Sequence, residues 1–247
     1  MSLIVKPANP VIRMTPRAIP LLALVTALSA ACNGRSPQSE PGAAAPVTTH
    51  EQSSGSEHGF PDPQTYAHQL DDPARDAWQK PGEVVGLLEC RPGMTAVDLG
   101  AGTGYFMGYL SEAVGADGRV LALDAEQSMI DAMAARIERD QLLNIRPSLV
   151  SPDDPALPPR SVDRILIVNT WHHISSRVGY AEKLLAALRP GGLLLIVDLT
   201  MDSPLGPPPE KRLTHDTVMH ELEAAGFAAK LVEESLPYQY VVAGRAP

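Results

Sequence analysis

The chain has 247 residues, with a formal net charge of −9, 44% hydrophobic residues and 4% aromatic residues. This apolar fraction is close to that of globular proteins, so the chain can bury a core, and wholesale disorder, a collagen-like repeat and a coiled coil are excluded. An acidic chain without a compact lysine and arginine cluster repels a phosphate backbone, so nucleic acid is not expected as a partner. Two cysteines, Cys32 and Cys90, are too few for a disulfide framework or a zinc cage of several cysteines. Cys90 is expected to be a packed thiol.

The first 31 residues resemble an export signal. Basic residues in 1–17 precede an uncharged, mostly apolar run over 19–31, which is too short to cross a bilayer as a permanent helix. The residues Leu-Ser-Ala-Ala before Cys32 resemble the lipobox of bacterial lipoproteins, whose signal is cut before a cysteine that becomes lipidated. The resemblance implies a protein of the cell envelope, lipid-anchored to a bacterial membrane through Cys32. Ordinary secretion, or a cytoplasmic location if the signal is not used, are the alternatives.

The segment over 32–60 is rich in Ser, Pro, Gly, Ala, Gln and Glu and has almost no large apolar side chains. This composition predicts a flexible tether. The folded domain is then expected over 61–247. Within it, the segment over 71–81 is predicted either as a lid, with Trp78 or Tyr66 covering an apolar surface, or as an amphipathic helix anchored on the domain.

Strand-like and helix-like segments alternate along the predicted domain. A helix is predicted to begin at Pro81, another to be capped by Ser128 and to bury Met129 and Met133, and a third to be capped by Thr214. Such alternation predicts an α/β fold with a Rossmann-like, doubly wound sheet, mostly parallel with an antiparallel C-terminal strand, and with helices on both faces. Ligands of such sheets sit outside the carboxyl ends of the strands. The predicted strands cover 94–99, 119–124, 146–150, 162–169, 193–199, 230–234 and 238–242, and further helices cover 105–114 and 178–188.

A glycine loop follows the first predicted strand, with Asp98, Gly100, Gly102 and Gly104 at alternate positions. Glycines, which lack Cβ atoms, let the chain turn tightly and let a ligand lie against backbone amides at a helix N-terminus. Asp124 ends the second strand 20 residues after Gly104, which is the spacing of a carboxylate that accepts hydrogen bonds from both ribose hydroxyls. The pattern predicts a ligand with an unphosphorylated ribose.

Two ligand classes share this layout. A dinucleotide fingerprint would place its last small residue at Tyr105, whose bulk obstructs the pyrophosphate, so a nucleotide-dependent oxidoreductase is the weaker alternative. The glycines instead run G-x-G-x-G after an acidic residue, and the chain over about 71–245 resembles the class I S-adenosylmethionine-dependent methyltransferases. The Leu-Arg-Pro-Gly-Gly turn before the fifth strand is also typical of that family. The chain is most similar to its small-molecule branch, which includes the ubiquinone and menaquinone C-methyltransferases.

The resemblance implies S-adenosylmethionine as the cofactor and methyl transfer to a small organic acceptor as the activity. A lipoprotein that binds S-adenosylmethionine without catalysis is an alternative. By the same resemblance, Asp98 holds the methionyl ammonium and Asp124 takes the ribose hydroxyls. Gly100, Gly102 and Gly104 approach the methionyl part and the ribose.

Residues after the third and fourth predicted strands complete the expected site. The family often receives the adenine amino group on an acidic residue after the third strand, which here points to Asp153 or Asp154, and Asn169 is expected as a further cofactor contact. His172 and His173 follow, where an acceptor approaches the methyl group, and a neutral imidazole there can take a proton. Because adjacent side chains of an extended segment point opposite ways, we expect one histidine to enter the pocket and to line it, with general-base catalysis as the alternative. The spacing of the two histidines does not match a metal site.

Overall fold

The computed structural model describes residues 72–247. The signal over 1–31, the tether over 32–60, Cys32 and Tyr66 therefore lie outside the described residues. Within 72–247 no helix is both long and apolar enough to span a bilayer. The strands are β1 (Thr95–Leu99), β2 (Arg119–Asp124), β3 (Ile145–Leu149), β4 (Val162–Val168), β5 (Leu188–Leu199), β6 (Ala228–Val232) and β7 (Gln239–Arg245).

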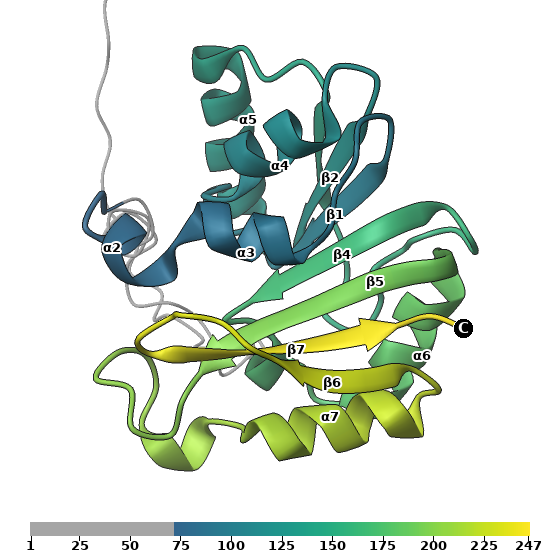
Figure 1. Ribbon diagram of the computed structural model, residues 1–247. Helices are drawn as coiled ribbons and strands as arrows, with labels where there is room; N and C mark the ends of the chain where they lie inside the picture. The colour runs from purple at the N-terminus through teal and green to yellow at the C-terminus, as the bar shows by residue number, and fades with distance from the viewer. Residues whose placement is uncertain (1–71) are drawn as a thin grey trace, which may run out of the picture. The chain divides into compact units, whose positions relative to one another are not determined.

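The described strands form one seven-stranded sheet in the order β3-β2-β1-β4-β5-β7-β6 (Figure 1). Neighbouring strands from β3 to β5 pair in parallel, whereas β7 is antiparallel to both β5 and β6. This is the predicted Rossmann-like sheet with an antiparallel C-terminal strand. The chain order reverses between β1 and β4, so the carboxyl ends of these two strands lie at the switch point where ligands of such sheets bind.

Helices cover both faces of the sheet (Figure 1). Those of the N-terminal half lie on one face and those of the C-terminal half on the other, as right-handed crossovers require when a sheet grows outward in both directions. The helices are α2 (Arg75–Gln79), α3 (Pro81–Leu87), α4 (Met107–Val114), α5 (Gln127–Asp140), α6 (Arg177–Ala187) and α7 (His215–Ala224), and two short 3-10 helices are η1 (Trp171–His173) and η2 (Pro209–Lys211).

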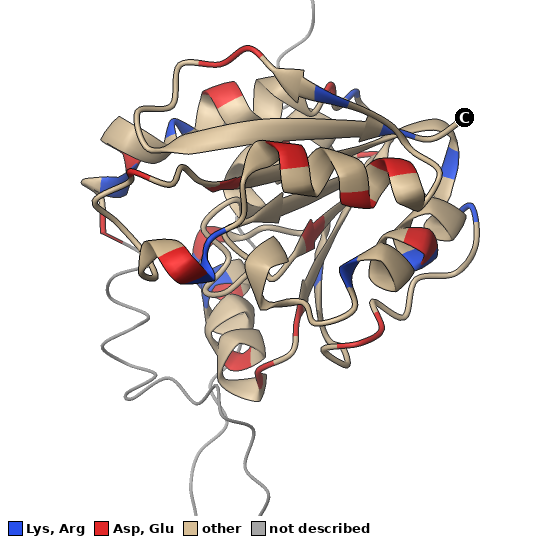
Figure 2. Cartoon of the chain, turned by 90° about the horizontal axis from the view of Figure 1, so that it is seen from below, with Lys and Arg blue, Asp and Glu red and all other residues tan. Residues whose placement is uncertain are grey.

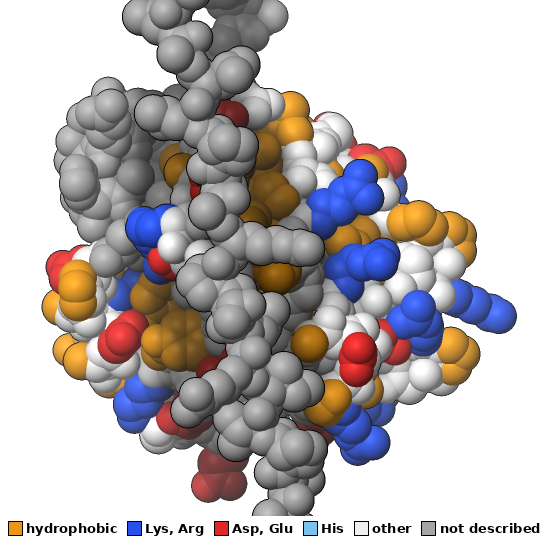
Figure 3. Space-filling model, turned by 90° about the horizontal axis from the view of Figure 1, so that it is seen from above, with side chains coloured by type: hydrophobic (Ala, Val, Ile, Leu, Met, Phe, Trp, Pro, Cys, Tyr) orange, Lys and Arg blue, Asp and Glu red, His pale blue; other side chains and the backbone are white. Residues whose placement is uncertain are grey.

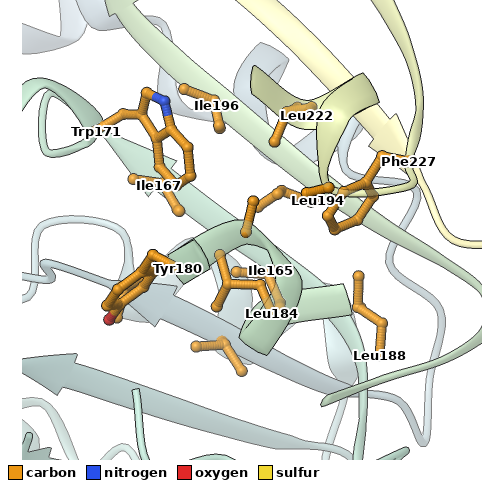
Figure 4. Packing of buried hydrophobic residues seen from close by; sticks show 14 of the residues in the cluster. Ile165, Ile167, Trp171, Tyr180, Leu184, Leu188, Leu194, Ile196, Leu222 and Phe227 are labelled. Atoms are coloured by element: carbon orange, nitrogen blue, oxygen red, sulfur yellow. The ribbon is translucent and has the colours of Figure 1, made fainter. Parts of the chain in front are cut away.

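The central strands bury both of their faces, which explains their continuous apolar sequence. Along β4, Ile165 and Ile167 belong to the core under α6 and α7, whereas Leu166 and Val168 belong to the core under α3 and α4. Adjacent side chains of a strand point to opposite faces, so a strand covered on both sides carries apolar residues at successive positions, as Ile165 to Val168 do. Figure 4 shows the first of these cores, where Leu222 from α7 lies near strand and α6 side chains.

Two helix boundaries differ in how well the sequence located them. Thr214 caps α7 as predicted, since its side chain accepts a hydrogen bond from the Thr217 amide. The predicted Ser128 cap is wrong, because α5 already begins at Gln127. The N-cap residue is Glu126, whose amide donates a hydrogen bond to Oδ1 of Asp124 at 3.0 Å and so helps to turn the chain after β2.

Acidic and basic residues are interspersed along the helices and loops of the domain (Figure 2). On the face seen from above, hydrophobic side chains reach the surface between charged ones (Figure 3). The charge seen in Figure 2 is therefore a mixture of both signs and not one acidic block.

Candidate active site

The glycine loop after β1 adopts a backbone that favours glycine at each predicted position. The φ angles are +71° at Gly100, +56° at Gly102 and +82° at Gly104, in the left-handed region that other residues adopt only at a cost. A Cβ atom added to Gly100 would overlap the side chain of Thr170, which follows β4. The loop after β1 and the segment after β4 are thus packed directly against one another.

Asp124 meets this loop, as its spacing predicted. Its Oδ2 accepts a hydrogen bond from the Gly102 amide at 2.8 Å, while Oδ1 faces the Glu126 amide. Burial raises the pKa of Asp124, and the backbone hydrogen bonds from Gly102, Glu126 and Ala125 oppose that rise. The carboxylate is held at the carboxyl edge of the sheet beside the glycines. That it takes ribose hydroxyls stays a prediction.

Asp98 is a buried carboxylate of the site with an incomplete set of hydrogen bonds. The residue is 2% exposed, and its Oδ2 has no hydrogen-bond partner within the described part of the chain. Burial raises the pKa of Asp98 to about 7. The positive charge of Arg75 opposes this rise, and the negative charge of Asp124 adds to it. A buried carboxylate oxygen without a partner is costly, so the position needs a donor that the protein itself does not provide. A cationic ammonium group fits this requirement.

Arg75 was not singled out by the sequence. It lies on α2, is 8% exposed, and its guanidinium lies 4.0 Å from the centroid of the Tyr105 ring. The Tyr105 hydroxyl in turn donates to the carboxylate of Asp76 on the same helix. Tyr105, the residue that argued against a dinucleotide site, therefore helps to hold α2 beside the glycine loop.

Within the predicted segment over 71–81, the structure has the short helix α2, which polar side chains anchor on the domain. Gln79 is fully buried, and its Nε2 donates to Oε1 of Gln239 at 2.7 Å. The predicted helix is thus present and anchored, but the prediction that it is amphipathic is wrong, since its buried residues are Arg75 and Gln79. Trp78 is half-buried on the same helix, and its function as a cover for a ligand stays a prediction.

Asn169 adopts a left-handed conformation with φ +51° directly after β4, which asparagine tolerates better than most residues. Its Oδ1 accepts a hydrogen bond from Nε2 of Gln239 at 2.8 Å. Gln239 therefore links Gln79 on α2 to Asn169 at the end of β4. Contact of Asn169 with the cofactor stays a prediction.

The acidic pair after β3 lies in an exposed turn closed by a bridge between Ser151 and Asp154. Asp154 accepts a hydrogen bond from the Ala156 amide at 2.8 Å and lies 3.5 Å from Nζ of Lys183. The first of these contacts, with help from Lys183, lowers the pKa of Asp154. Asp153 lines an open groove of about 750 Å³ along α6. The side chain of Asp154 is thus held by contacts within the turn and with Lys183, whereas Asp153 lines the groove. An adenine contact by either residue stays a prediction.

The two histidines do not lie in an extended segment, so that expectation is wrong. Residues Trp171–His173 form the 3-10 helix η1, because the His173 amide donates to the carbonyl of Thr170 at 2.9 Å. The imidazole rings of His172 and His173 therefore lie side by side, with centroids 4.2 Å apart, instead of pointing to opposite sides. His173 is exposed, whereas the His172 side chain is 6% exposed.

Asp198 is a site residue that the sequence reasoning missed. It lies near the end of β5, is 2% exposed, and places both carboxylate oxygens 3.0 Å from Nδ1 of His172. A signal was present, since the aspartate follows the apolar run over 193–197 at the carboxyl end of a central strand. Because β4 and β5 pair as neighbours, Asp198 near the end of β5 lies close to His172, which follows β4.

Comparisons with known proteins agree with this geometry. The family model described as "Methyltransferase domain" matches residues 96–192. A solved structure, an S-adenosylmethionine-dependent methyltransferase from Aquifex aeolicus, is 30% identical, covers 75% of this chain and 99% of its own, and has a TM-score of 0.71. The chain belongs to the S-adenosylmethionine-dependent methyltransferases.

Curated relatives of this methyltransferase are similar over part of its length. A ubiquinone/menaquinone biosynthesis C-methyltransferase of Hydrogenovibrio crunogenus is 23% identical over 50% of this chain and 48% of its own. A protein-L-isoaspartate O-methyltransferase of Methanopyrus kandleri is 30% identical over 44% of this chain and 46% of its own. The chain spans about half the length of the curated relatives that it matches.

The cofactor of the family is S-adenosylmethionine, and the residues of this site fit it. Its methionyl end carries an ammonium group, which supplies the donor that the buried oxygen of Asp98 lacks. Membership of this family argues against the alternative of a nucleotide-dependent oxidoreductase. Among residues 72–247, no group of three or more His, Cys, Asp or Glu side chains has the arrangement of a metal site.

Proposed function

We propose that this protein transfers the methyl group of S-adenosylmethionine to a small organic acceptor. The observation that carries the proposal is the buried Asp98 carboxylate, which has an unpartnered oxygen beside a glycine loop that the Gly102–Asp124 bond holds in place. When bound, the cofactor supplies an electrophilic methyl group on a sulfonium that already serves as the leaving group. The protein's task is then to bind and to align the acceptor with that methyl group.

The proposal assigns one function to each side chain of the cofactor site. Asp98 pairs with the methionyl ammonium, and Arg75, whose charge already acts on Asp98, pairs with the methionyl carboxylate. Asp124 accepts from the ribose hydroxyls, and the three glycines of the loop admit the methionyl part and the ribose. Asp153 receives the adenine amino group, and Asn169 contacts the cofactor from the end of β4.

Two cofactor analogues test these assignments. S-adenosylhomocysteine carries both the amino-acid end and the ribose, whereas 5′-methylthioadenosine carries only the ribose and the base. Arg75→Met is expected to weaken binding of S-adenosylhomocysteine by about 10-fold or more and to leave 5′-methylthioadenosine unchanged, because one charge-assisted hydrogen bond to the carboxylate is lost. Equal losses for both ligands in calorimetry would contradict the assignment of Arg75.

Turnover is tested separately from binding. Calorimetric titration with S-adenosylmethionine, S-adenosylhomocysteine and NAD is expected to show binding of the first two only. Transfer of labelled methyl groups from S-adenosylmethionine into metabolite extracts is then expected to yield a methylated small molecule. Binding without any transfer would instead establish a non-catalytic S-adenosylmethionine-binding protein.

The acceptor is proposed to belong to the small-molecule branch of the family. Support comes from relatives named ubiquinone/menaquinone biosynthesis C-methyltransferase and demethylmenaquinone methyltransferase, which are 23% and 24% identical over about half of this chain. The mixed surface charge also gives no reason to expect a nucleic acid. Fractionation of the extract by size before the transfer assay checks this, since label in macromolecules alone would contradict it.

We also propose that the protein is lipid-anchored in the cell envelope through Cys32. The basic start, the short apolar run and the Leu-Ser-Ala-Ala-Cys sequence support this. Intact-mass analysis of membrane-fraction protein from the native host is expected to show loss of residues 1–31 and an added acyl mass. A soluble chain that keeps Met1 would contradict the proposal, and Cys32→Ala is the matched variant that should remain unlipidated.

A further inference from the structure

Trp171 fixes the turn that carries His172. Its side chain is fully buried, lying in the core near Ile167 and Ile196 (Figure 4), and its Nε1 donates to Oε2 of Glu221 at 2.9 Å. Oε1 of Glu221 also accepts from Nε of Arg177 at 2.7 Å. A side chain buried by packing and by a hydrogen bond leaves its neighbours little rotational freedom. The backbone of His172 is therefore set before any ligand binds.

Asp198 fixes the ring of His172. Both of its carboxylate oxygens lie 3.0 Å from Nδ1, and its Oδ1 also accepts from the Leu199 amide at 2.9 Å. The side chains of His172 and Asp198 are 6% and 4% exposed. A carboxylate is an acceptor, so the proton of a neutral imidazole lies on Nδ1 and leaves Nε2 with its lone pair. Among residues 72–247, Nε2 has no hydrogen-bond partner.

The turn lies beside the cofactor loop. Thr170, two residues before His172, is the residue that a Cβ atom on Gly100 would strike. Asn169, one residue earlier, is tied to β5, since its amide donates to the carbonyl of Val197 at 2.8 Å. The pair of His172 and Asp198 therefore lies at the carboxyl edge of β4 and β5, next to the glycine loop and outside the contacts assigned to the cofactor.

We propose that His172 is the general base of the reaction, that Asp198 is its positioning residue, and that the acceptor is a phenol or enol hydroxyl. The proposal rests on the proposed function. In the step, Nε2 of His172 takes the hydroxyl proton while the acceptor oxygen forms a bond to the methyl carbon. The bond between that carbon and sulfur breaks, its electron pair stays on sulfur, and the imidazolium later releases its proton to solvent.

The chemistry of the pair selects this acceptor class. A phenol with a pKa near that of tyrosine, about 10, is almost wholly protonated at neutral pH, so it gains from a base. A thiol, with a pKa of about 8.5, is partly ionised by itself and gains less. A protonated amine would be repelled by the positive sulfonium. After the proton transfer, the imidazolium lies against the Asp198 carboxylate, which stabilises the charge that forms.

Other titratable groups surround the pair. Tyr240 on β7 pairs with Asp198 across the sheet, donates its hydroxyl proton to the carbonyl of Leu213, and has a pKa raised by burial and by Asp198. The ring of His173 lies beside that of His172 at a tilt of 42°, and the centroid of the His215 ring lies 6.0 Å from that of Tyr240. Arg177 forms an ion pair with Glu221, the residue that accepts the hydrogen bond of Trp171. The contact of the His172 ring with a carboxylate is the one that Asp198 makes.

The first test needs no acceptor. The full chain is labelled with 15N-histidine, and His172→Asn assigns the His172 signal by its loss. At about pH 8 the wild-type protein is expected to show His172 with its proton on Nδ1, and Asp198→Asn is expected to lose this preference. A proton on Nε2 in the wild-type protein would overturn the proposal, and this reading does not depend on whether the Asp198 variant folds.

The second test measures transfer of labelled methyl groups to a series of substituted phenols of increasing pKa, with an alkyl thiol and a primary amine beside them. Phenols are the expected acceptors, and His172→Asn is expected to lower their turnover by about 100-fold or more while S-adenosylhomocysteine affinity stays within about 2-fold. The loss should grow with the pKa of the phenol. Asp198→Asn is expected to lower turnover as well, because the His172 ring loses the carboxylate that orients it. His220→Asn, an exposed histidine on α7, is the control.

The outcomes separate this inference from the proposed function. If S-adenosylmethionine binds and only the thiol or the amine is methylated, or if no phenol is methylated, the acceptor class is wrong while the cofactor site stands. If His172→Asn retains wild-type turnover on a phenol, the general base is wrong. If neither S-adenosylmethionine nor S-adenosylhomocysteine binds the wild-type protein, the proposed function itself fails.

Discussion

The backbone amide of Gly102 lies 2.8 Å from Oδ2 of Asp124 and donates a hydrogen bond to it. This bond joins the glycine loop after β1 to the last residue of the neighbouring strand β2. Because Oδ1 of Asp124 faces the Glu126 amide at 3.0 Å, backbone groups orient both oxygens of the carboxylate. The proposed ribose contact is therefore set by the sheet and does not depend on flexible side chains.

Asp124→Ala is expected to weaken S-adenosylhomocysteine and 5′-methylthioadenosine equally, because both ligands carry the ribose. Leaving the ribose hydroxyls unpaired should cost about 1–3 kcal/mol, or about 5- to 150-fold in the dissociation constant. Isothermal titration calorimetry on both ligands measures this. Asp131→Ala, on the exposed surface of α5, is the matched control. Unchanged affinities in a folded Asp124 variant would show that the carboxylate has no such function.

Asp98→Asn is expected to stabilise the ligand-free protein at about pH 8. Burial raises the pKa of Asp98 to about 7 in the folded protein, whereas an unfolded chain has the ordinary value of about 3.9. Between these values the folded state binds more protons, so the free energy of unfolding falls as pH rises. The variant should gain about 1–4 kcal/mol at pH 8 and lose this slope. Urea unfolding at several pH values checks it, and identical pH profiles for both proteins would contradict it.

The same variant is expected to bind S-adenosylhomocysteine about 10-fold or more weakly at pH 8, because the amide cannot pair as a charge with the ammonium. In the wild-type protein, affinity should rise as pH rises through about 7, where Asp98 ionises. The affinity of 5′-methylthioadenosine, which has no ammonium, should stay constant in both proteins. A wild-type affinity for S-adenosylhomocysteine that does not change between pH 6 and pH 8 would rule out this pairing.

Gln239→Leu is expected to lower the free energy of unfolding by about 1–3 kcal/mol, because it leaves the buried amide of Gln79 and the half-buried amide of Asn169 without this partner. Hydrogen exchange should also quicken in α2, which loses its link to β7. Chemical denaturation and exchange mass spectrometry measure the two effects. Gln127→Leu, at an exposed position of α5, is the control. Unaltered exchange over residues 75–79 would mean that the link does not hold α2.

Cys90 is expected to react slowly with alkylating reagents. Burial raises the pKa of its thiol to about 11, so at pH 8 its thiolate fraction is about 100-fold or more below that of an ordinary cysteine. A chain with Cys32→Ser isolates the reaction of Cys90, and the same chain in urea should react at the ordinary rate. Rapid modification of the folded chain would contradict the raised pKa of this partly buried thiol.

The sequence by itself determined the features that depend on neighbouring residues. Alternating apolar segments predicted the order of strands and helices, because the periodicity of side-chain direction is local. The three glycines predicted a loop with positive φ angles, since that backbone conformation is a property of single residues. The spacing of Asp124 placed it beside the loop, because consecutive parallel strands pair as neighbours. Helix starts were predicted less well, as the Ser128 cap shows: α5 begins at Gln127 without a side-chain cap.

The tertiary structure alone decided which buried polar groups meet. His172 and Asp198 are 26 residues apart, and Gln79 and Gln239 are 160 residues apart. Neither pair has a pattern along the chain, because its contact depends on strand order and on packing across the sheet. The 3-10 turn of η1, in which Trp171 is fully buried, was likewise not predicted by the local sequence pattern. The cofactor loop is encoded in short stretches of chain, whereas the proposed base and its carboxylate exist as a pair only because β4 and β5 lie side by side.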